Sequence, residues 1–500
     1  MNIDYLINSL YLIKPEIAIS ATLVLLVLMD LIMGNNKKLL PYIAFGGLIV
    51  TSFFIVEQFG MSSLAFATKA NKGMVVTDPF GAFFKAIVVF ASFIVVYLSI
   101  KSDEIKASFE RHGEYYTLIF GMILGMFFMI SASDLILIYL SLELVSLSSY
   151  VLAGFTKTSK RNSEASLKYV IYGGVSSGIM LFGISILYGI TGSTNLYEIN
   201  SLIQASSIPN LTFVLAGVLI FVGIGYKISA APFHFWTPDV YEGAPISITA
   251  FLSVASKAAG FALLIRFIKI TFIRSVDSEG YWHLVDMIDW KTFFIFLSII
   301  TMTLGNFAAL WQDNLKRMLA YSSIAHAGYL LLGMAVLSNQ GMIAIIIYFT
   351  IYAFMNLGAF FVVMLIANKI GSEDIDDYKG LGYSQPFLGV SLAIFLVSLT
   401  GLPPTAGFVG KLYLFIALVD AKMITLAVIA LLNSVVSLYY YIRVLKNLFL
   451  TRPEKGIFEF NVSFSNGFVM VLLAAPVIIF GIYFTPIIDL AKSSMQILGF

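Results

Sequence analysis

The chain has 500 residues, of which 59% are hydrophobic and 12% are charged, and its formal net charge is +2. Soluble proteins carry about 25% charged residues, so the composition excludes an ordinary globular protein, and the small net charge gives no support for a nucleic-acid partner. The chain has no cysteine, which excludes disulfides, iron–sulfur clusters and thiolate metal sites on it.

Apolar blocks of about 17–25 residues, long enough to cross a bilayer as a helix, recur along the whole sequence. No polar stretch is long enough for a separate soluble domain. We therefore predict an all-α, polytopic membrane protein with fourteen spans in the lipid bilayer. The predicted spans are residues 16–33, 39–59, 81–100, 115–131, 134–154, 164–189, 211–231, 245–273, 292–309, 319–338, 341–368, 386–421, 423–450 and 464–484.

The orientation of these spans follows from the charges between them. The first residues lack the basic region and the cleavage site of a signal peptide, so we expect the first helix to be retained. Odd-numbered connections hold nearly twice as many lysines and arginines as the even-numbered connections and the two tails. Because positive charge favours the cytoplasmic side, we expect both termini on the outer side.

Four ionisable residues lie far from the ends of the predicted spans, where a charge costs about 3 kcal/mol on insertion scales. Glu143 lies about 14 Å along the fifth span and Lys257 about 18 Å along the eighth, at 1.5 Å per residue. Both depths are close to the middle of a hydrocarbon layer about 30 Å thick. Lys227 lies late in the seventh span and Lys411 lies within the twelfth.

Three interpretations of these charges are open. A long lysine can extend its ammonium group to the membrane surface, although the depth of Lys257 and the short side chain of Glu143 argue against this. A glutamate–lysine pair can hold helices together, but a buried pair is a poor source of stability. The third interpretation is a proton relay, in which a carboxylate controls the proton affinity of a lysine. We favour the relay because four such groups occur in one chain.

Histidine titrates near neutral pH and therefore suits such a relay. His326 lies in the tenth predicted span, where a relay role and a packing role are equally open. His234 follows a break in the seventh span and is interpreted as a half-channel or structural residue.

Two predicted spans are interrupted by proline. Pro232 interrupts the seventh, and Pro403 and Pro404 interrupt the twelfth. Proline removes a backbone donor and clashes with the preceding turn, so both helices should break. Interrupted helices at matching positions indicate inverted repeats in transporters, although a proline kink alone is common. We predict two inverted five-helix repeats, residues 115–273 and 292–450, between an N-terminal part (1–114) and a C-terminal part (451–500).

The sequence contains no recognisable nucleotide, haem or cluster motif. Lys411 follows a glycine, but Leu412 stands where a phosphate-binding loop has Ser or Thr. The energy for transport is therefore expected to come from an ion gradient or from partner subunits.

Three motifs resemble a known family. They are residues 231–245 (Ala-Pro-Phe-His-Phe-Trp-Thr-Pro-Asp-Val-Tyr-Glu-Gly-Ala-Pro), residues 312–329 (Gln-Asp-Asn-Leu-Lys-Arg-Met-Leu-Ala-Tyr-Ser-Ser-Ile-Ala-His-Ala-Gly-Tyr), and residues 401–408 (Gly-Leu-Pro-Pro-Thr-Ala-Gly-Phe) followed by Lys411. They resemble the N subunits of NADH-quinone oxidoreductase, respiratory complex I, and the resemblance covers about residues 75–450. The Val-Tyr-Glu-Gly stretch at 240–243 is similar to N subunits rather than to their L and M relatives.

The resemblance implies a function and a site. The chain would be a proton-translocating translocase subunit that couples quinone reduction elsewhere in the complex to proton transfer. Glu143 and Lys227 would be partners, Lys257 the central lysine and Lys411 the terminal lysine, with His326 as a bridge. The chain would bind no cofactor and carry no redox chemistry, because NADH, FMN, iron–sulfur clusters and quinone would belong to other subunits.

The same resemblance implies partners and a location. The partners would be the antiporter-like M and L subunits and the small J, K and A subunits, in a bacterial inner membrane with both termini periplasmic. A subunit of a multisubunit cation/proton antiporter or of a membrane-bound hydrogenase complex would share the repeats and lysines. A purely structural membrane scaffold is the alternative without transport, and the buried charges argue against it.

Overall fold

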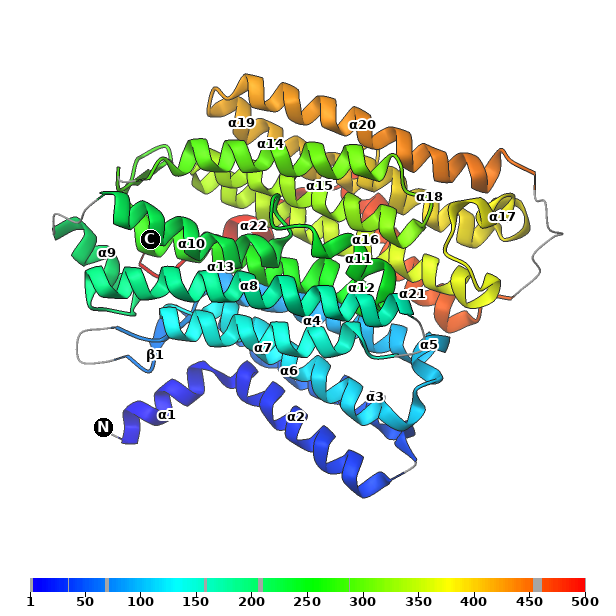
Figure 1. The fold of residues 1–500 in the computed structure, drawn as a ribbon, viewed down its shortest axis with the longest axis horizontal. Helices are drawn as coiled ribbons and strands as arrows, with labels where there is room; N and C mark the ends of the chain where they lie inside the picture. Colours follow the sequence, from blue (N-terminus) through cyan, green and yellow to red (C-terminus); the bar gives the residue numbers. More distant parts are fainter. Residues whose placement is uncertain are drawn as a thin grey trace.

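The computed structural model describes residues 3–34, 36–67, 72–156, 160–205, 210–286, 288–452 and 461–499. Met1 and Phe500, for which the sequence predicts an outer location, lie outside these residues. The long helices run roughly parallel in one bundle, and the N and C marks lie at the same end of it (Figure 1). Helices α9 (Leu196–Ala205) and α5 (Asp103–Lys106) lie at opposite ends.

Thirteen helices in the described part of the chain are long and apolar enough to cross a membrane. They account for every predicted span except the twelfth. The eighth span is one continuous helix that consists of three segments, α12, η3 and α13. The helices are α2 (Lys14–Met33), α3 (Leu40–Gln58), α4 (Pro79–Lys101), α6 (His112–Ser131), α7 (Leu135–Ala153), α8 (Lys160–Thr191), α10 (Asn210–Ile228), α12–η3–α13 (Ile246–Phe251, Leu252–Ser256, Lys257–Phe272), α14 (Trp290–Ala309), α15 (Leu315–Val336), α16 (Asn339–Ile370), α20 (Ile424–Phe449) and α21 (Phe464–Ile482).

The twelfth predicted span is divided into two shorter helices, and the other thirteen predicted spans are found in the described part of the chain. The remaining elements are short and lie mostly at the ends of the bundle. The two halves are α18 (Pro386–Thr400) and α19 (Ala406–Asp420); the short elements are α1 (Ile3–Leu12), η1 (Lys37–Leu39), η2 (Phe109–Arg111), α11 (Trp236–Gly243), η4 (Ile375–Tyr378), α17 (Leu381–Ser384), α22 (Thr485–Ser493), and the antiparallel pairs β1 (Ser63–Ala65) with β2 (Val75–Thr77) and β3 (Ile273–Val276) with β4 (Trp282–Leu284).

Both predicted helix breaks are present. Helix α10 ends at Ile228, and α11 begins at Trp236 after the connector that contains Pro232 and His234. Helix α18 ends at Thr400, and α19 begins after Pro403 and Pro404. At the first break, the backbone N–H of Ala231 donates to Thr301 Oγ1 (3.0 Å), and the indole N–H of Trp236 donates to the carbonyl of Tyr226 (3.1 Å).

These bonds satisfy backbone groups that the break removes from the helical ladder, as an apolar surrounding requires. The grouping of the spans into two inverted repeats stays a prediction.

The interior of the bundle is formed by the eighth span with α15 and α16. The segment Ile246–Phe272 is buried along its whole length, whereas α2 and α21 leave most of their side chains at the surface. A helix that is apolar all round is expected in such an interior position. Lys257 therefore lies at the centre of the protein as well as deep in its span.

Helices α14 and α15 pack with their backbones in contact. A Cβ atom on Gly305 of α14 would lie 2.5 Å from the backbone nitrogen of Ala325, and one on Gly328 of α15 would lie 2.4 Å from that of Met302. Both distances are too short for any side chain. The two glycines allow α15 to lie directly against α14, which fixes the face that α15 turns toward the interior.

Candidate proton-transfer site

Lys257 begins α13, next to the π-helical segment η3, and its side chain is almost completely buried. Its ammonium group donates to the carbonyl oxygen of Ser323 (2.7 Å) and to the Ser323 hydroxyl (2.5 Å), both on α15. In the described part of the chain Lys257 has no carboxylate partner. Its charge is thus supported only by neutral oxygens, which do not fix it in the protonated form.

His326 lies one turn after Ser323 on α15 and is also buried. Its Nδ1 is 2.6 Å from the hydroxyl of Tyr348 on α16, and its Nε2 is 3.4 Å from the hydroxyl of Tyr441 on α20. The charges of Lys257 and Lys411 both act on the imidazole. Along α15, His326 lies between Ser323, which binds Lys257, and Tyr329, whose ring is beside Lys411, and it has a hydroxyl near each ring nitrogen.

Lys411 lies on α19, directly after the second break. Its ammonium group donates to the carbonyl oxygen of Thr400 (2.7 Å), the last residue of α18, and to the hydroxyl of Ser434 on α20 (3.1 Å). The same nitrogen is 4.5 Å from the ring centroid of Tyr329, and Ser434 donates to the Tyr329 hydroxyl (3.2 Å). Lys411 thus satisfies a carbonyl freed by the break and also contacts polar groups of two other helices.

Residues 323, 326 and 329 recur every three positions along α15 and therefore share one face of it. We call the set from Lys257 to Lys411 the central axis. No direct hydrogen bond joins Ser323 to His326, or His326 to Tyr329, whose ring centroids are 5.9 Å apart. The central axis consists of Lys257, Ser323, His326, Tyr329, Ser434 and Lys411.

Glu143 and Lys227 lie near each other without forming a contact. Lys227 is buried on α10, and its ammonium group is 3.4 Å from the hydroxyl of Ser146 on α7. Glu143, also on α7, acts electrostatically on Lys227. Its Oε1 is buried without a hydrogen-bond partner, and the two residues form no ion pair in the described structure. The predicted coupled pair is therefore open in this structure.

Two further buried ion pairs were missed in the sequence. Lys85 on α4 is 2.6 Å from Glu16 on α2, and both side chains are 1% exposed. Arg266 on α13 binds Asp78 with two hydrogen bonds of 2.7 and 2.8 Å, and both side chains are completely buried. These residues lie nearer to the ends of their spans, where hydropathy alone suggests contact with the membrane surface.

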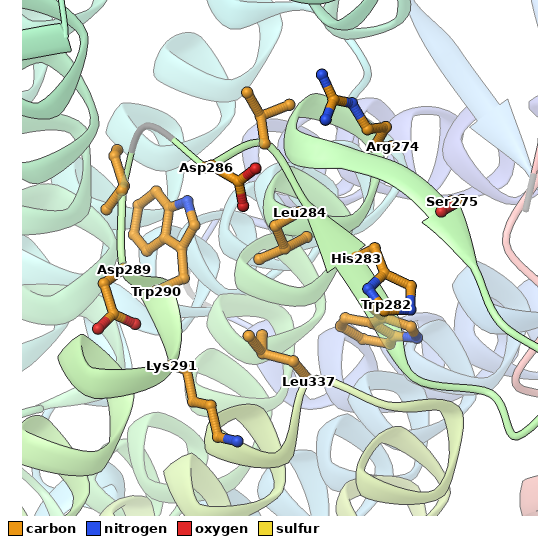
Figure 2. A pocket seen from close by; sticks show the side chains of 12 residues that line it. Arg274, Ser275, Trp282, His283, Leu284, Asp286, Asp289, Trp290, Lys291 and Leu337 are labelled. Carbon is orange, nitrogen blue, oxygen red and sulfur yellow. The ribbon is translucent and has the colours of Figure 1, made fainter.

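A hollow of about 560 Å³ lies beside the β3–β4 hairpin (Figure 2), and none of the residues that line it belongs to the central axis. Arg274, Asp286, Asp289 and Lys291 line it together with Trp282. It collects charges of both signs at the surface beyond the helix ends, so its residues are distinct from the buried lysines.

A helical bundle with two interrupted spans and several buried lysines defines an antiporter-like membrane protein. Residues 132–437 match the family described as "NADH:quinone oxidoreductase/Mrp antiporter, TM". The N subunit 2 of NADH-quinone oxidoreductase from Chloroherpeton thalassium is 48% identical over 97% of this chain and 94% of its own length. The N subunit from Chlorobium chlorochromatii is 44% identical over 97% and 94%. The chain belongs to the family of NADH-quinone oxidoreductase N subunits.

Solved structures share the fold. A chain of respiratory complex I from Thermus thermophilus superposes with a TM-score of 0.77 at 28% identity, covering 95% of this chain and 98% of that one. A chain of the Mrp complex from Dietzia has a TM-score of 0.81 at 19% identity, covering 98% and 97%.

Proposed function

We propose that this chain translocates protons as a membrane subunit of an NADH-quinone oxidoreductase. Glu143, Lys227, Lys257, His326 and Lys411 carry the protons. One observation supports this most: the polar side chains of the central axis lie between two buried lysines, and none of them is a carboxylate. A lysine held only by neutral oxygens gains or loses a proton without breaking an ion pair, which is what a carrier requires.

The transfer runs along the interior face of α15. Lys257 exchanges its proton through the Ser323 hydroxyl, His326 accepts and donates through its two ring nitrogens, and Lys411 receives the proton beside Tyr329 and Ser434. We infer that water bridges the two unbonded steps on α15, because bridging water transfers protons through hydrogen bonds. Lys227 supplies protons to the central axis, and the charge of Glu143 controls when Lys227 releases them.

The proposal also includes the redox chemistry, the partner subunits and the location of the chain. The chain carries no redox chemistry itself, and electron transfer from NADH through flavin and iron–sulfur clusters to quinone belongs to partner subunits. Those partners are the antiporter-like M and L subunits and the small J, K and A subunits, in a bacterial inner membrane with both termini periplasmic. Purification of the native complex with identification of every subunit tests these partners, and it separates this proposal from a cation/proton antiporter or a hydrogenase complex.

Lys411 decides between a carrier and a structural role. Arginine keeps a permanent charge and hydrogen-bonds carbonyls, but it does not deprotonate in proteins. If Lys411 only satisfies the Thr400 carbonyl, Lys411→Arg retains proton pumping. If Lys411 carries protons, we expect Lys411→Arg to lower quinone-linked pumping about tenfold or more. Proton uptake into inverted membrane vesicles that hold the assembled variant complex measures this.

Lys411→Met is the neutral comparison for this experiment. It removes both the charge and the hydrogen bond to Thr400, so it reports the effect of losing the lysine altogether. Full pumping by the arginine variant removes Lys411 from the relay.

A further inference from the structure

Helix α11, the second half of the interrupted seventh span, presents buried polar atoms that have no hydrogen-bond partner. They are the Oγ1 atom of Thr237 and the hydroxyl of Tyr241, and Nδ1 of His234 precedes them in the connector. Thr237 and Tyr241 are completely buried. They are four residues apart, so they lie on the same face of the helix, with a rise of about 6 Å between them.

Unpaired polar atoms in a protein interior indicate water. Nearly all buried polar side-chain atoms in proteins are hydrogen-bonded, and those without a protein partner are bound by ordered water. One such atom is a common exception. Three within eight residues, at helical spacing and beside a helix break, indicate a hydrated face that leads along α11.

The Tyr241 end of this face reaches the central axis. The Ser323 oxygen accepts hydrogen bonds from Lys257 (2.5 Å) and from the Tyr352 hydroxyl (3.0 Å). When Lys257 is neutral, its amine lone pair can accept the Ser323 hydrogen, which frees one lone pair of the Ser323 oxygen to accept from a further donor. Helix α11 packs against α15, the helix that carries Ser323, and the hydroxyl of Tyr241 has no hydrogen-bond partner of its own in the described structure.

We propose that Tyr241 is a further proton-transfer residue, which connects water along the Thr237 face of α11 to Ser323 and Lys257. This inference rests on the proposed function. A protonated water molecule gives a proton to the Tyr241 oxygen, and so becomes neutral water, as the hydroxyl proton of Tyr241 moves to Ser323. The hydroxyl proton of Ser323 then moves to the neutral amine of Lys257. One O–H bond of water breaks, one N–H bond of lysine forms, and both hydroxyls end as they began.

The ring of Tyr241 is held independently of its hydroxyl. Its centroid lies 6.2 Å from that of Trp236 and 6.4 Å from that of Phe360, both in edge-to-face geometry. Tyr241→Phe therefore removes the proton-transfer group and keeps the aromatic packing. Thr237→Val similarly replaces the hydroxyl of Thr237 with a methyl group of the same shape.

The test uses the complete complex in its native membrane, with assembly measured on native gels. We expect Tyr241→Phe to assemble normally and to lower quinone-linked proton uptake about tenfold, with an increased solvent deuterium isotope effect. Thr237→Val should lower proton uptake less, because a neighbouring water still reaches Tyr241. Tyr378→Phe is the matched control: Tyr378 is also completely buried with an unpaired hydroxyl, but it lies in η4, away from the axis.

Two results overturn the inference. One is normal pumping by assembled Tyr241→Phe in membranes where Lys257→Met is inactive, which rejects Tyr241 and keeps the proposed function. The other is a map of the native complex at a resolution that shows water, with none within hydrogen-bond distance of the Tyr241 hydroxyl. Normal pumping by Lys257→Met itself rejects the proposed function instead.

Discussion

Buried cations in this protein fall into two groups that differ in their partners. Arg266 and Lys85 each bind a buried carboxylate directly, Asp78 and Glu16 respectively. Lys257 and Lys411 donate to hydroxyl and carbonyl oxygens, and neither has a carboxylate partner among the described residues. A cation that forms an ion pair is held in its charged form, whereas one among neutral oxygens is free to change its protonation state. The paired cations therefore connect helices, and the others are suited to carry protons.

The largest effect, a loss of assembled complex, is expected from breaking one of the buried ion pairs. Arg266→Met leaves Asp78 buried and uncompensated, which costs about 3–5 kcal/mol, so we expect little assembled complex in the membrane. The double variant Arg266→Met with Asp78→Asn removes both charges, and Asn still caps α4, so assembly should largely return. Native gels of solubilised membranes measure this. Normal assembly of the single variant would contradict the distinction between the two groups.

Lys227 is intermediate between the groups, because Glu143 acts on it from a distance without binding it. We expect Lys227→Ala to assemble and to lower quinone-linked proton uptake about tenfold, because it removes the carrier. Glu143→Gln keeps the shape and removes the controlling charge, so its loss should be equal or smaller. If both variants pump protons normally in assembled complex, Glu143 and Lys227 do not control proton transfer.

The smallest expected effect comes from single cysteine substitutions at the surface. Labelling these cysteines shows which end of the bundle faces which side of the membrane. Lys38 and Ser201 are exposed at opposite ends of the bundle, in η1 and α9 (Figure 1). The chain has no native cysteine, so Lys38→Cys and Ser201→Cys each give a single reactive site with pumping unchanged. An impermeant thiol reagent added to whole cells should label position 201 and spare position 38. The reverse labelling pattern would place both termini in the cytoplasm.

The sequence was sufficient for the spans and for the breaks, because apolar length and proline act locally. It also placed Lys257 and Lys411 within spans, because a position can be counted along one helix, and both side chains are buried; their role in proton transfer stays a prediction. It did not identify Ser323, Tyr329 or Ser434. Serine and tyrosine are common in membrane helices, and whether they contact a buried lysine depends on which helix faces them. Lys85 and Arg266 were missed for a related reason. A charged residue near the end of a span is interpreted as lying at the membrane surface unless it is known that other helices bury it.

The close backbone packing of α14 on α15, where Gly305 faces Ala325 and Gly328 faces Met302, limits where movement can occur. Helix α15 carries three groups of the axis and lies directly against α14, so it cannot rotate without lifting the two backbones apart. Interiors packed this closely do not deform continuously. We therefore expect α15 to stay fixed against α14 during transport, while the side chains and the half-helices that face it move. Replacing either glycine would disturb every step along α15 at once, without touching a group that binds a proton.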